Sequence, residues 1–243
     1  LTGYLSREDF KILETNPAVE KIEPEYDIRV TLQDTIHLTN ASKVWQQQIN
    51  SKNATGKGET VCIIDTGINY NHSDLGSCFG AGCKVLGGND FVFNDSDPMD
   101  DHGHGTHVAG IAAANGLLKG IAPDASIVAL KACNASGSCF TSAIEDSLKW
   151  CVDNSAQFNI SVISMSFGTT SLFSSYCDSD PAFEDWAKQV NAAAEKNISV
   201  VAAAGNDVSI SGIASPACIK NITSVGATTK ADAIASFTNR NNI

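Results

Sequence analysis

Three features that the sequence lacks each exclude a class of protein. No run of about 18 apolar residues occurs, so a transmembrane helix is not expected. Basic residues are few: 16 Lys and Arg stand against 27 Asp and Glu, and the net charge of -11 argues against binding to phosphate backbones. No C-x-x-C pair occurs, so a zinc ribbon is not expected.

The composition and the two ends of the sequence indicate how it is organised. With 43% hydrophobic and 18% charged residues, the composition is that of a globular protein, and 243 residues suffice for one large α/β domain, or for one domain with a small appendage. The sequence begins with Leu-Thr-Gly (residues 1–3), without Met or a signal-peptide pattern, and stops without a helix cap at residues 241–243. We therefore expect a piece of a longer protein.

The eight cysteines favour an oxidising environment. Two pairs are close in sequence, Cys78 with Cys83 and Cys133 with Cys139. Mainly Gly, Ala and Ser lie between the members of each pair, which suits a short disulfide loop. Cys62 lies in an apolar run and is predicted to be a buried, unreactive thiol. The pairings of the remaining three stay open: Cys151, Cys177 and Cys218.

Glycosylation acceptor motifs are frequent. Asn-x-Ser/Thr sequons begin at Asn40, Asn53, Asn71, Asn94, Asn134, Asn159, Asn197 and Asn221. Random placement would give roughly three, although chance in a chain rich in Asn and Ser is the alternative. Together with the cysteines, the sequons predict a secreted, disulfide-bonded glycoprotein.

The first part of the chain differs from the rest. Residues 1–33 are charged, contain no Cys, and suggest short strands separated by turns at the prolines. The polar stretch 31–39 has no clear period and is interpreted as a linker. Residues 41–49 are expected to form a short helix with Asn40 as its N-cap.

From residue 59 onward, apolar runs alternate with amphipathic stretches. The runs suit strands buried on both faces and cover 60–64, 126–130, 160–165, 198–203 and 222–225. The expected helices between them cover 105–114, 141–152 and 181–195. This alternation predicts an α/β fold with a parallel sheet covered by helices on both sides.

One candidate catalytic residue follows the first apolar run. Asp65 ends this run, and open α/β sheets bind ligands beyond the carboxyl ends of their strands. Asp-Thr-Gly is also typical of aspartic proteases, whose mechanism needs two carboxylates. No second Asp-Thr-Gly or Asp-Ser-Gly occurs, so that alternative would require a dimer of short chains.

A second candidate lies in the histidine-rich segment 101–110. His104 is surrounded by small residues where the chain is expected to turn helical, which suits an imidazole at a helix N-terminus with room for a substrate. Metal binding by His102, His104 and His107 is the alternative. No carboxylate at helical spacing completes a known metal motif, which argues against it.

Two further motifs end expected strands with small residues. The run 198–203 leads to Asn206, whose amide can donate to a developing oxyanion, although an Asx-turn is the favoured explanation when this motif is taken alone. The segment 164–168 can pair with an extended peptide through main-chain hydrogen bonds, although it is also typical of a core strand.

Together, the four motifs resemble those of the subtilisin-like serine proteases in order and spacing. The string His-Gly-Thr-His-Val-Ala-Gly (104–110) is the most specific part. The resemblance covers residues 34–243 and implies a three-layer α/β sandwich with a mainly parallel sheet, C-terminally truncated.

Site roles follow from this resemblance residue by residue. It implies that Asp65 is the triad acid, His104 the general base and acid, and Asn206 the oxyanion-hole donor. The implied substrate-binding residues are Ser166, Phe167, Gly168, Ala203, Ala204 and Gly205, with Ala214 near the base of the pocket.

The resemblance also places the family's nucleophile outside this sequence. It lies in Gly-Thr-Ser-x-Ala, roughly 65 residues after the oxyanion Asn, and thus beyond Ile243. The nearest local string, 168–171, follows the substrate strand and cannot replace the missing helix. The chain as given is therefore expected to be inactive. A non-catalytic binding or scaffold protein with this fold is the alternative.

Calcium is the cofactor that the resemblance implies. Asp74 matches a family ligand, although the loop 114–120 that would supply its partners is shortened. A second loop contains three carboxylates, Asp90, Asp95 and Asp97, and carboxylate oxygens suit Ca²⁺. A solvated acidic loop is the alternative.

Residues 1–33 resemble the C-terminal part of the family's inhibitory propeptide. The recognisable string is Asn-Pro-Ala-Val-Glu-Lys-Ile-Glu-Pro (16–24), and the expected self-cleavage falls within 31–34. The resemblance thus implies a secreted, monomeric serine endopeptidase, made as a zymogen with its own propeptide in the cleft and acting on polypeptides.

Overall fold

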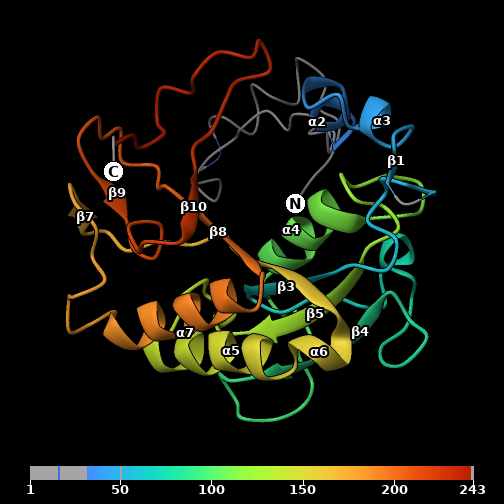
Figure 1. Ribbon diagram of the computed structural model, residues 1–243, viewed down its shortest axis with the longest axis horizontal. Helices are drawn as coiled ribbons and strands as arrows, with labels where there is room; N and C mark the ends of the chain where they lie inside the picture. Colours follow the sequence, from blue (N-terminus) through green and yellow to red (C-terminus); the bar gives the residue numbers. More distant parts are fainter. Residues whose placement is uncertain (1–15, 17–31, 50, 242–243) are drawn as a thin grey trace. The chain divides into compact units, whose positions relative to one another are not determined.

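The fold is that of a computed structural model (Figure 1), which describes residue 16, residues 32–49 and residues 51–241. The chain divides into two compact units, 1–31 and 32–243, and every described helix and strand lies in the second. The propeptide-like segment and the strands expected within residues 1–33 therefore fall almost entirely outside the described residues.

A six-stranded sheet forms the centre of the second unit. Its strands, in spatial order, are β10 (Ile222–Val225), β8 (Ser199–Ala203), β6 (Ile160–Met165), β3 (Thr60–Asp65), β5 (Ser126–Lys131) and β4 (Val85–Asp90). All neighbours are parallel, so the expected parallel sheet is confirmed. β3 lies between β6 and β5, and its C-terminal residue is Asp65.

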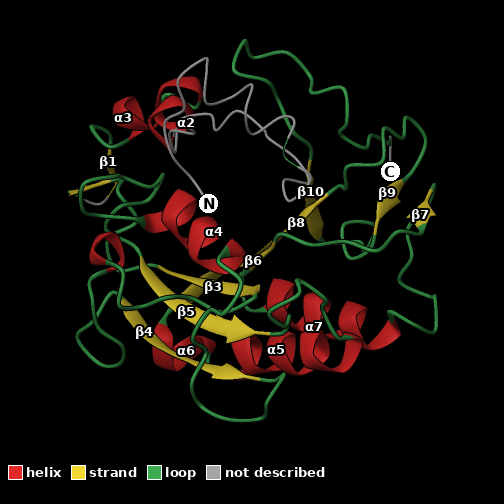
Figure 2. Cartoon of the chain, turned by 180° about the vertical axis from the view of Figure 1, so that it is seen from behind, coloured by secondary structure: helices red, strands yellow, loops and turns green. Residues whose placement is uncertain are grey.

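Helices cover both faces of this sheet. Figures 1 and 2 show α4 (His104–Ala113) on one face and α5 (Thr141–Asp153), α6 (Ser155–Phe158) and α7 (Glu184–Glu195) on the other. Side chains alternate along β3, so Ile63 joins the cluster on the α4 side while Cys62 and Ile64 join the cluster on the α5 side. The expectation of helices on both sides is confirmed.

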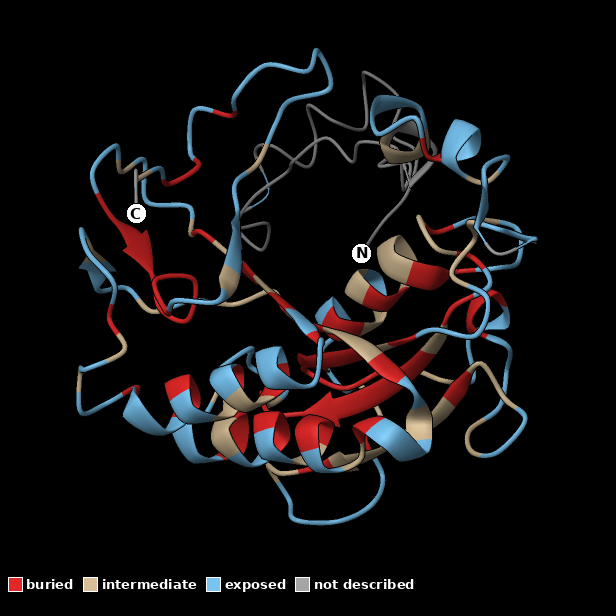
Figure 3. Cartoon of the chain, in the orientation of Figure 1, coloured by how far each residue is buried: buried red, intermediate tan, exposed pale blue. Residues whose placement is uncertain are grey.

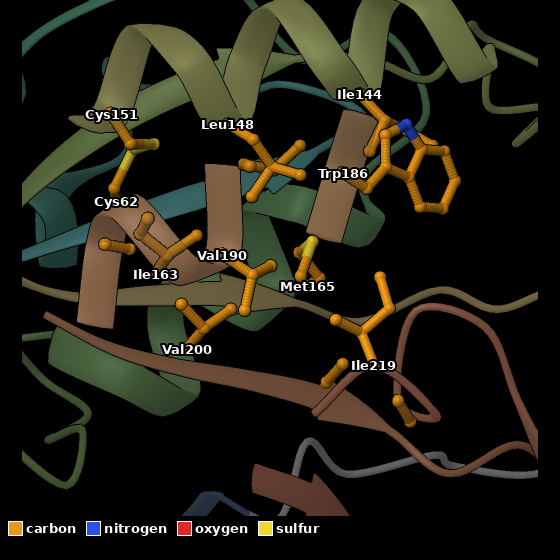
Figure 4. Packing of buried hydrophobic residues seen from close by; sticks show 14 of the residues in the cluster. Cys62, Ile144, Leu148, Cys151, Ile163, Met165, Trp186, Val190, Val200 and Ile219 are labelled. Carbon is orange, nitrogen blue, oxygen red and sulfur yellow. A yellow bond between two sulfur atoms is a disulfide. The ribbon is translucent and has the colours of Figure 1, made fainter. Parts of the chain in front are cut away.

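The larger core cluster lies between the sheet and helices α5 and α7. Ile144, Leu148 and Cys151 recur at helical spacing along α5, so one side of this helix is buried. Figure 4 shows them beside Ile163 of β6 and Val190 of α7, and Figure 3 shows burial concentrated in this region. Each buried aliphatic side chain contributes about 1.5–3 kcal/mol.

All eight cysteines lie in the described part of the chain and are paired. The disulfides are Cys62–Cys151, Cys78–Cys83, Cys133–Cys139 and Cys177–Cys218. The two short loops are confirmed. The prediction of a free thiol at Cys62 is wrong, because the side of β3 that carries its sulfur faces α5, which carries Cys151.

The segment before the sheet differs from its expected structure. The stretch 31–39 was expected to be a linker, but α2 (Leu32–Leu38) occupies it and packs with α3 (Ala41–Val44). Such packing overrides weak local helix propensity. The helix expected over 41–49 ends at Val44, and Asn40 precedes it without a side-chain cap. The next residues form the hairpin strands β1 (Gln48–Ile49) and β2 (Lys52–Asn53).

The remaining elements are short, except one strand. The five expected strands are present with bounds close to those predicted, but β4 was not expected because its sequence contains two glycines and two polar residues. A one-turn helix, η1 (Ser73–Leu75), precedes β4, and β7 (Leu172–Phe173) pairs with β9 (Ile213–Ala214).

None of the helices in the described ranges is long and apolar enough to cross a membrane.

Candidate active site

The end of β3 and the start of α4 bring an acid and a base together. Asp65 is the last residue of β3 and His104 the first of α4. His104 Nδ1 lies 2.7 Å from Asp65 Oδ1. The Asp65 side chain is 2% exposed and the His104 side chain 44% exposed. A carboxylate at Nδ1 fixes the ring orientation and the tautomer that carries its proton on Nδ1, which leaves Nε2 as an acceptor.

The backbone around Asp65 holds this carboxylate in place. Oδ1 also accepts from the Thr66 amide at 2.7 Å, while the Asp65 carbonyl accepts from the amides of Ala132 and Cys133. Oδ2 is buried and has no partner among the described residues. An unpaired oxygen in a buried carboxylate is costly, and such exceptions are typical of functional sites.

A glycine allows the helix to approach the strand. A Cβ on Gly105 would lie 2.1 Å from the Gly67 carbonyl oxygen and 3.1 Å from Asp65 Cβ. Only glycine therefore permits the separation at which His104 reaches Asp65. This close contact explains why glycine follows His104 in the sequence motif.

Asp100 organises the first turn of α4, a role that the sequence interpretation missed. Its Oδ1 accepts from the Thr66 hydroxyl and the amides of His102 and Gly103, and its Oδ2 accepts from the amide and hydroxyl of Thr106. Burial opposes ionisation, but these hydrogen bonds, that of the Thr106 hydroxyl foremost, hold the pKa of Asp100 below its usual value. The only sequence signal was an Asp four residues before His104.

Lys131 is a second group that the sequence interpretation missed. Its side chain is 1% exposed, and Nζ donates to the Thr66 carbonyl at 2.7 Å, the Cys133 carbonyl at 3.1 Å and Asp101 Oδ1 at 2.5 Å. The three donors of the ammonium group thus join the ends of β3 and β5 to the loop before His104. In the sequence, Lys131 follows an apolar run, and this position does not indicate which groups its ammonium binds.

A pocket of about 240 Å³ lies beside the acid–base pair. Its lining consists of Asp65, Thr66, His102, His104, Cys133, Gly137, Cys139, Ser166 and Phe167. One wall is the segment after β6, and the opposite wall is the loop closed by the Cys133–Cys139 disulfide. The candidate substrate residues Ser166 and Phe167 therefore lie next to His104.

Of the other candidate substrate residues, Gly168 follows Phe167, while Ala203, Ala204 and Gly205 lie at the end of β8, the next strand of the sheet. Ala203 ends β8, and the Ala204 carbonyl accepts from the Ala214 amide at 2.9 Å. A Cβ on Gly168 would lie 2.8 Å from Ala214 Cβ. Ala214 thus joins the segments after β6 and β8, but the lining of the pocket at His104 does not include Asn206, which lies exposed in the loop after β8.

The string 168–171 does not form a helix. Thr169 Oγ1 donates to the Ser171 carbonyl and accepts from the Ser215 amide, so this string is tied to the segment after β9. Ser166 is the serine in the lining of the pocket beside His104. The expectation that 168–171 cannot replace a nucleophile-bearing helix agrees with these contacts.

Main-chain amides bind the carboxylate of Asp74, the first candidate calcium ligand. Its Oδ1 accepts from the Leu117 amide at 2.9 Å and its Oδ2 from the Leu118 amide at 3.1 Å. Burial opposes ionisation, yet these amides hold the pKa of Asp74 below its usual value. Amides of the loop 114–120 therefore hydrogen-bond to both oxygens of the Asp74 carboxylate, and its assignment as a calcium ligand remains a prediction.

The acidic loop is only partly organised for a metal. Asp90 Oδ1 accepts from the Val92 and Phe93 amides, and Asp95 Oδ1 accepts from the Asp97 amide. Asp97 Oδ1 accepts from Tyr70, and this hydrogen bond, with burial, raises the pKa of Tyr70 to about 12. Within the described residues no group of three or more His, Cys, Asp or Glu side chains is placed to hold a metal ion.

Comparison with known proteins places the chain among proteases. The model of the subtilase family matches residues 56–243. The chain is 37% identical to a thermophilic serine proteinase of Bacillus sp. (strain AK1), over 94% of this chain and 54% of that protein. It is 35% identical to an alkaline protease of Alkalihalobacillus alcalophilus, over 98% of this chain and 56% of that protein.

A solved structure is similar as well. The crystal structure of a cold adapted subtilisin-like serine proteinase matches with a TM-score of 0.64 and 30% identity, over 82% of this chain and 67% of that chain. The chain spans about half the length of the curated relatives named above.

Proposed function

The chain belongs to the subtilase family, and from this premise we propose that it is part of a serine endopeptidase that hydrolyses polypeptides. The observation that carries the proposal is the 2.7 Å contact between His104 Nδ1 and Asp65 Oδ1 beside a pocket. His104 acts as the general base that takes the proton of a serine hydroxyl and then donates it to the leaving amine. Asp65 orients the ring and stabilises the imidazolium.

The nucleophile and the oxyanion site complete this mechanism. We propose that the attacking serine lies beyond residue 243, and that the 243-residue chain alone does not turn over substrate. Asn206 donates its side-chain amide to the oxyanion of the tetrahedral intermediate, a contribution worth about 10²–10³ in rate. The segments at 166–168 and 203–205 pair with the extended polypeptide substrate.

Secretion as a monomeric zymogen is part of the proposal. Four disulfides support an oxidising compartment. Seven of the eight sequon asparagines are exposed, with Asn134 half-buried, which supports glycosylation. The propeptide resemblance of residues 1–33 supports a cleft-binding inhibitor removed by self-cleavage within 31–34. N-terminal sequencing of the matured enzyme tests this, since a start outside residues 30–40 contradicts it.

Calcium is proposed for the acidic loop. Asp90, Asp95 and Asp97 are not placed together as one group of metal ligands, so binding would require the loop to rearrange and bring their carboxylate oxygens together with main-chain carbonyls. Calorimetric titration of the 243-residue chain with Ca²⁺ should release or absorb heat and raise Tm. An Asp95→Asn variant that binds Ca²⁺ as tightly as the wild type would contradict the assignment.

The decisive experiment uses the protein made from its complete gene. It should cleave an unstructured peptide, and a serine-directed phosphonylating reagent should stop cleavage and label a peptide beyond residue 243. His104→Ala should lower kcat by about 10⁶-fold, the size found for subtilisin. Ser166→Ala serves as a matched control for a serine in the same pocket.

Two outcomes would reject the proposal. Labelling and loss of activity that require Ser166 would place the nucleophile inside this chain. Tight peptide binding without turnover by the complete protein would favour the non-catalytic scaffold.

A further inference from the structure

The loop that carries Asn206 surrounds a buried asparagine from a distant part of the chain. Asn239 is 1% exposed, although its side chain is polar and lies near the end of the described residues. A buried side-chain amide is costly unless its two donors and its acceptor are satisfied. The partners of Asn239 therefore indicate what the residue does.

The side chain of Asn239 hydrogen-bonds to residues within 204–209. Nδ2 donates to the Ala204 carbonyl at 3.1 Å and to Asp207 Oδ2 at 2.9 Å. Oδ1 accepts from the amides of Asp207 at 2.9 Å and Ser209 at 3.0 Å. The Asn239 amide also donates to the Gly205 carbonyl at 2.9 Å. These five hydrogen bonds, the Asn239 clamp, fix the backbone on both sides of Asn206.

The backbone within the Asn239 clamp adopts conformations that need such support. Gly205 has φ 103°, and a Cβ there would lie 2.4 Å from Asn239 Nδ2. Val208 has φ 62°, a left-handed value that is unfavourable for a β-branched residue. The Val208 amide donates at 3.0 Å to the carbonyl of Phe237, which precedes Asn239 by two residues. The loop is therefore folded around the amide, and this conformation would relax without it.

We propose that Asn239 is a positioning residue for oxyanion stabilisation: it holds the loop 204–209 so that Asn206 donates to the developing oxyanion. This inference rests on the proposed function, in which Asn206 is the oxyanion donor. Asn206 itself is exposed, so its orientation depends on the backbone that the clamp fixes. A displacement of about 1 Å in a catalytic group can cost about 10²-fold in rate.

The chemistry requires an amide at position 239. An aspartate there would have the same size, but it would direct an oxygen at the Ala204 carbonyl and at the Asp207 carboxylate, where Nδ2 now donates. A leucine would fill similar space without either function. Asn239→Asp and Asn239→Leu therefore remove the clamp in two different ways while keeping the number of side-chain non-hydrogen atoms.

The first test measures the clamp without any need for activity. Amide hydrogen exchange in the 243-residue chain should show Asp207 and Ser209 protected, and Asn239→Leu should accelerate their exchange by about tenfold or more. Exchange at Cys62, in the central strand, should not change. Asn154→Leu is the matched control, because Asn154 is half-buried and its amide group caps a carbonyl at the end of α5. Equal exchange at Asp207 and Ser209 in wild type and Asn239→Leu would overturn the inference.

The second test measures the effect on catalysis in the complete protein. With active sites titrated, Asn239→Asp should lower kcat by about 10–10² while KM changes less than about twofold. In an Asn206→Ala background, Asn239→Asp should lower kcat much less, because the donor that it positions is already absent. Fully additive losses would assign Asn239 a structural role only and overturn the inference.

The two tests separate this inference from the proposed function. An inactive wild-type enzyme would overturn the proposed function and the catalytic part of the inference. Unprotected amides in an active enzyme would overturn the Asn239 clamp alone.

Discussion

The acid–base pair and the loop after β8 lie at the same edge of one sheet, yet they are held by different chemistry. Around Asp65 and His104 the supporting groups are charged: Asp100 organises the first turn of α4 and Lys131 joins three segments. Around Asn206 the support is the neutral amide of Asn239. The two parts of the candidate site should therefore respond differently to the loss of a buried charged side chain.

The largest loss of stability is expected when the buried ammonium group of Lys131 is removed. Lys131→Met keeps the length of the side chain but leaves two buried carbonyls and Asp101 without their donor. The free energy of unfolding should fall by about 3 kcal/mol, as for other broken buried charge contacts. Urea denaturation measures this, with the exposed Lys149→Met as control. A loss no larger than that of the control would show that Lys131 does not hold these segments.

Matched glycine substitutions compare the two regions directly. Gly105→Ala should cost about 2 kcal/mol or more, because the new methyl group meets a backbone oxygen at 2.1 Å. Gly205→Ala should cost a similar amount through its clash with Asn239 Nδ2 and its positive φ. Gly58→Ala has a positive φ but an open surrounding, and measures backbone strain alone. Chemical denaturation that ranks Gly58→Ala equal to both would remove the packing argument.

The two glycine variants should also differ in what they disturb. Gly105→Ala should shift the NMR signals of the His104 ring, whereas Gly205→Ala should leave them in place and accelerate amide exchange at Asp207. Shifts of the His104 ring in both variants would show that the two regions are coupled.

The smallest expected effect is the pH dependence of the stability that Asp100 contributes. Asp100→Asn replaces Oδ2 by an amide nitrogen that cannot accept from Thr106, and should cost about 1 kcal/mol at pH 7. Because the pKa of Asp100 is lower in the folded chain, its stabilisation is complete above about pH 4 and is lost as the pH falls through the folded-state pKa. The difference between wild type and variant should therefore shrink in acid.

Thermal unfolding from pH 7 to pH 3 checks this dependence. Asp153→Asn is the control, because Asp153 is exposed and lies at the end of α5. A constant deficit for Asp100→Asn would contradict the role of its charge.

The sequence predicted local features well. Continuous apolar runs predicted five of the six main strands, with Asp65 at the end of the first, and the expected start of a helix pointed to His104. Buried strands and helix starts leave short-range patterns in the sequence. β4 was missed because it becomes a strand through its pairing with β5 rather than through its own residues. The prediction of a linker at 31–39 was wrong for a similar reason, because α2 forms there and packs with α3.

The supporting residues of the site could not be predicted from local patterns. Lys131 and Asn239 carry no motif, and their roles arise from partners up to 65 and 35 residues away. Cys62 likewise resembled an ordinary core residue, because its partner Cys151 is 89 positions later. Long-range contacts of this kind become visible only when the fold is known.

The Cys62–Cys151 disulfide has a consequence for kinetics. Both residues are 0% exposed, inside the cluster between β3 and α5, whereas Cys139 of the pocket loop is partly exposed. A thiol reductant can attack the buried bond only after the helix separates from the strand that ends in Asp65. Its rate of reduction therefore reports how often this part of the molecule opens, and comparison with the Cys133–Cys139 bond separates that opening from local motion of the pocket wall.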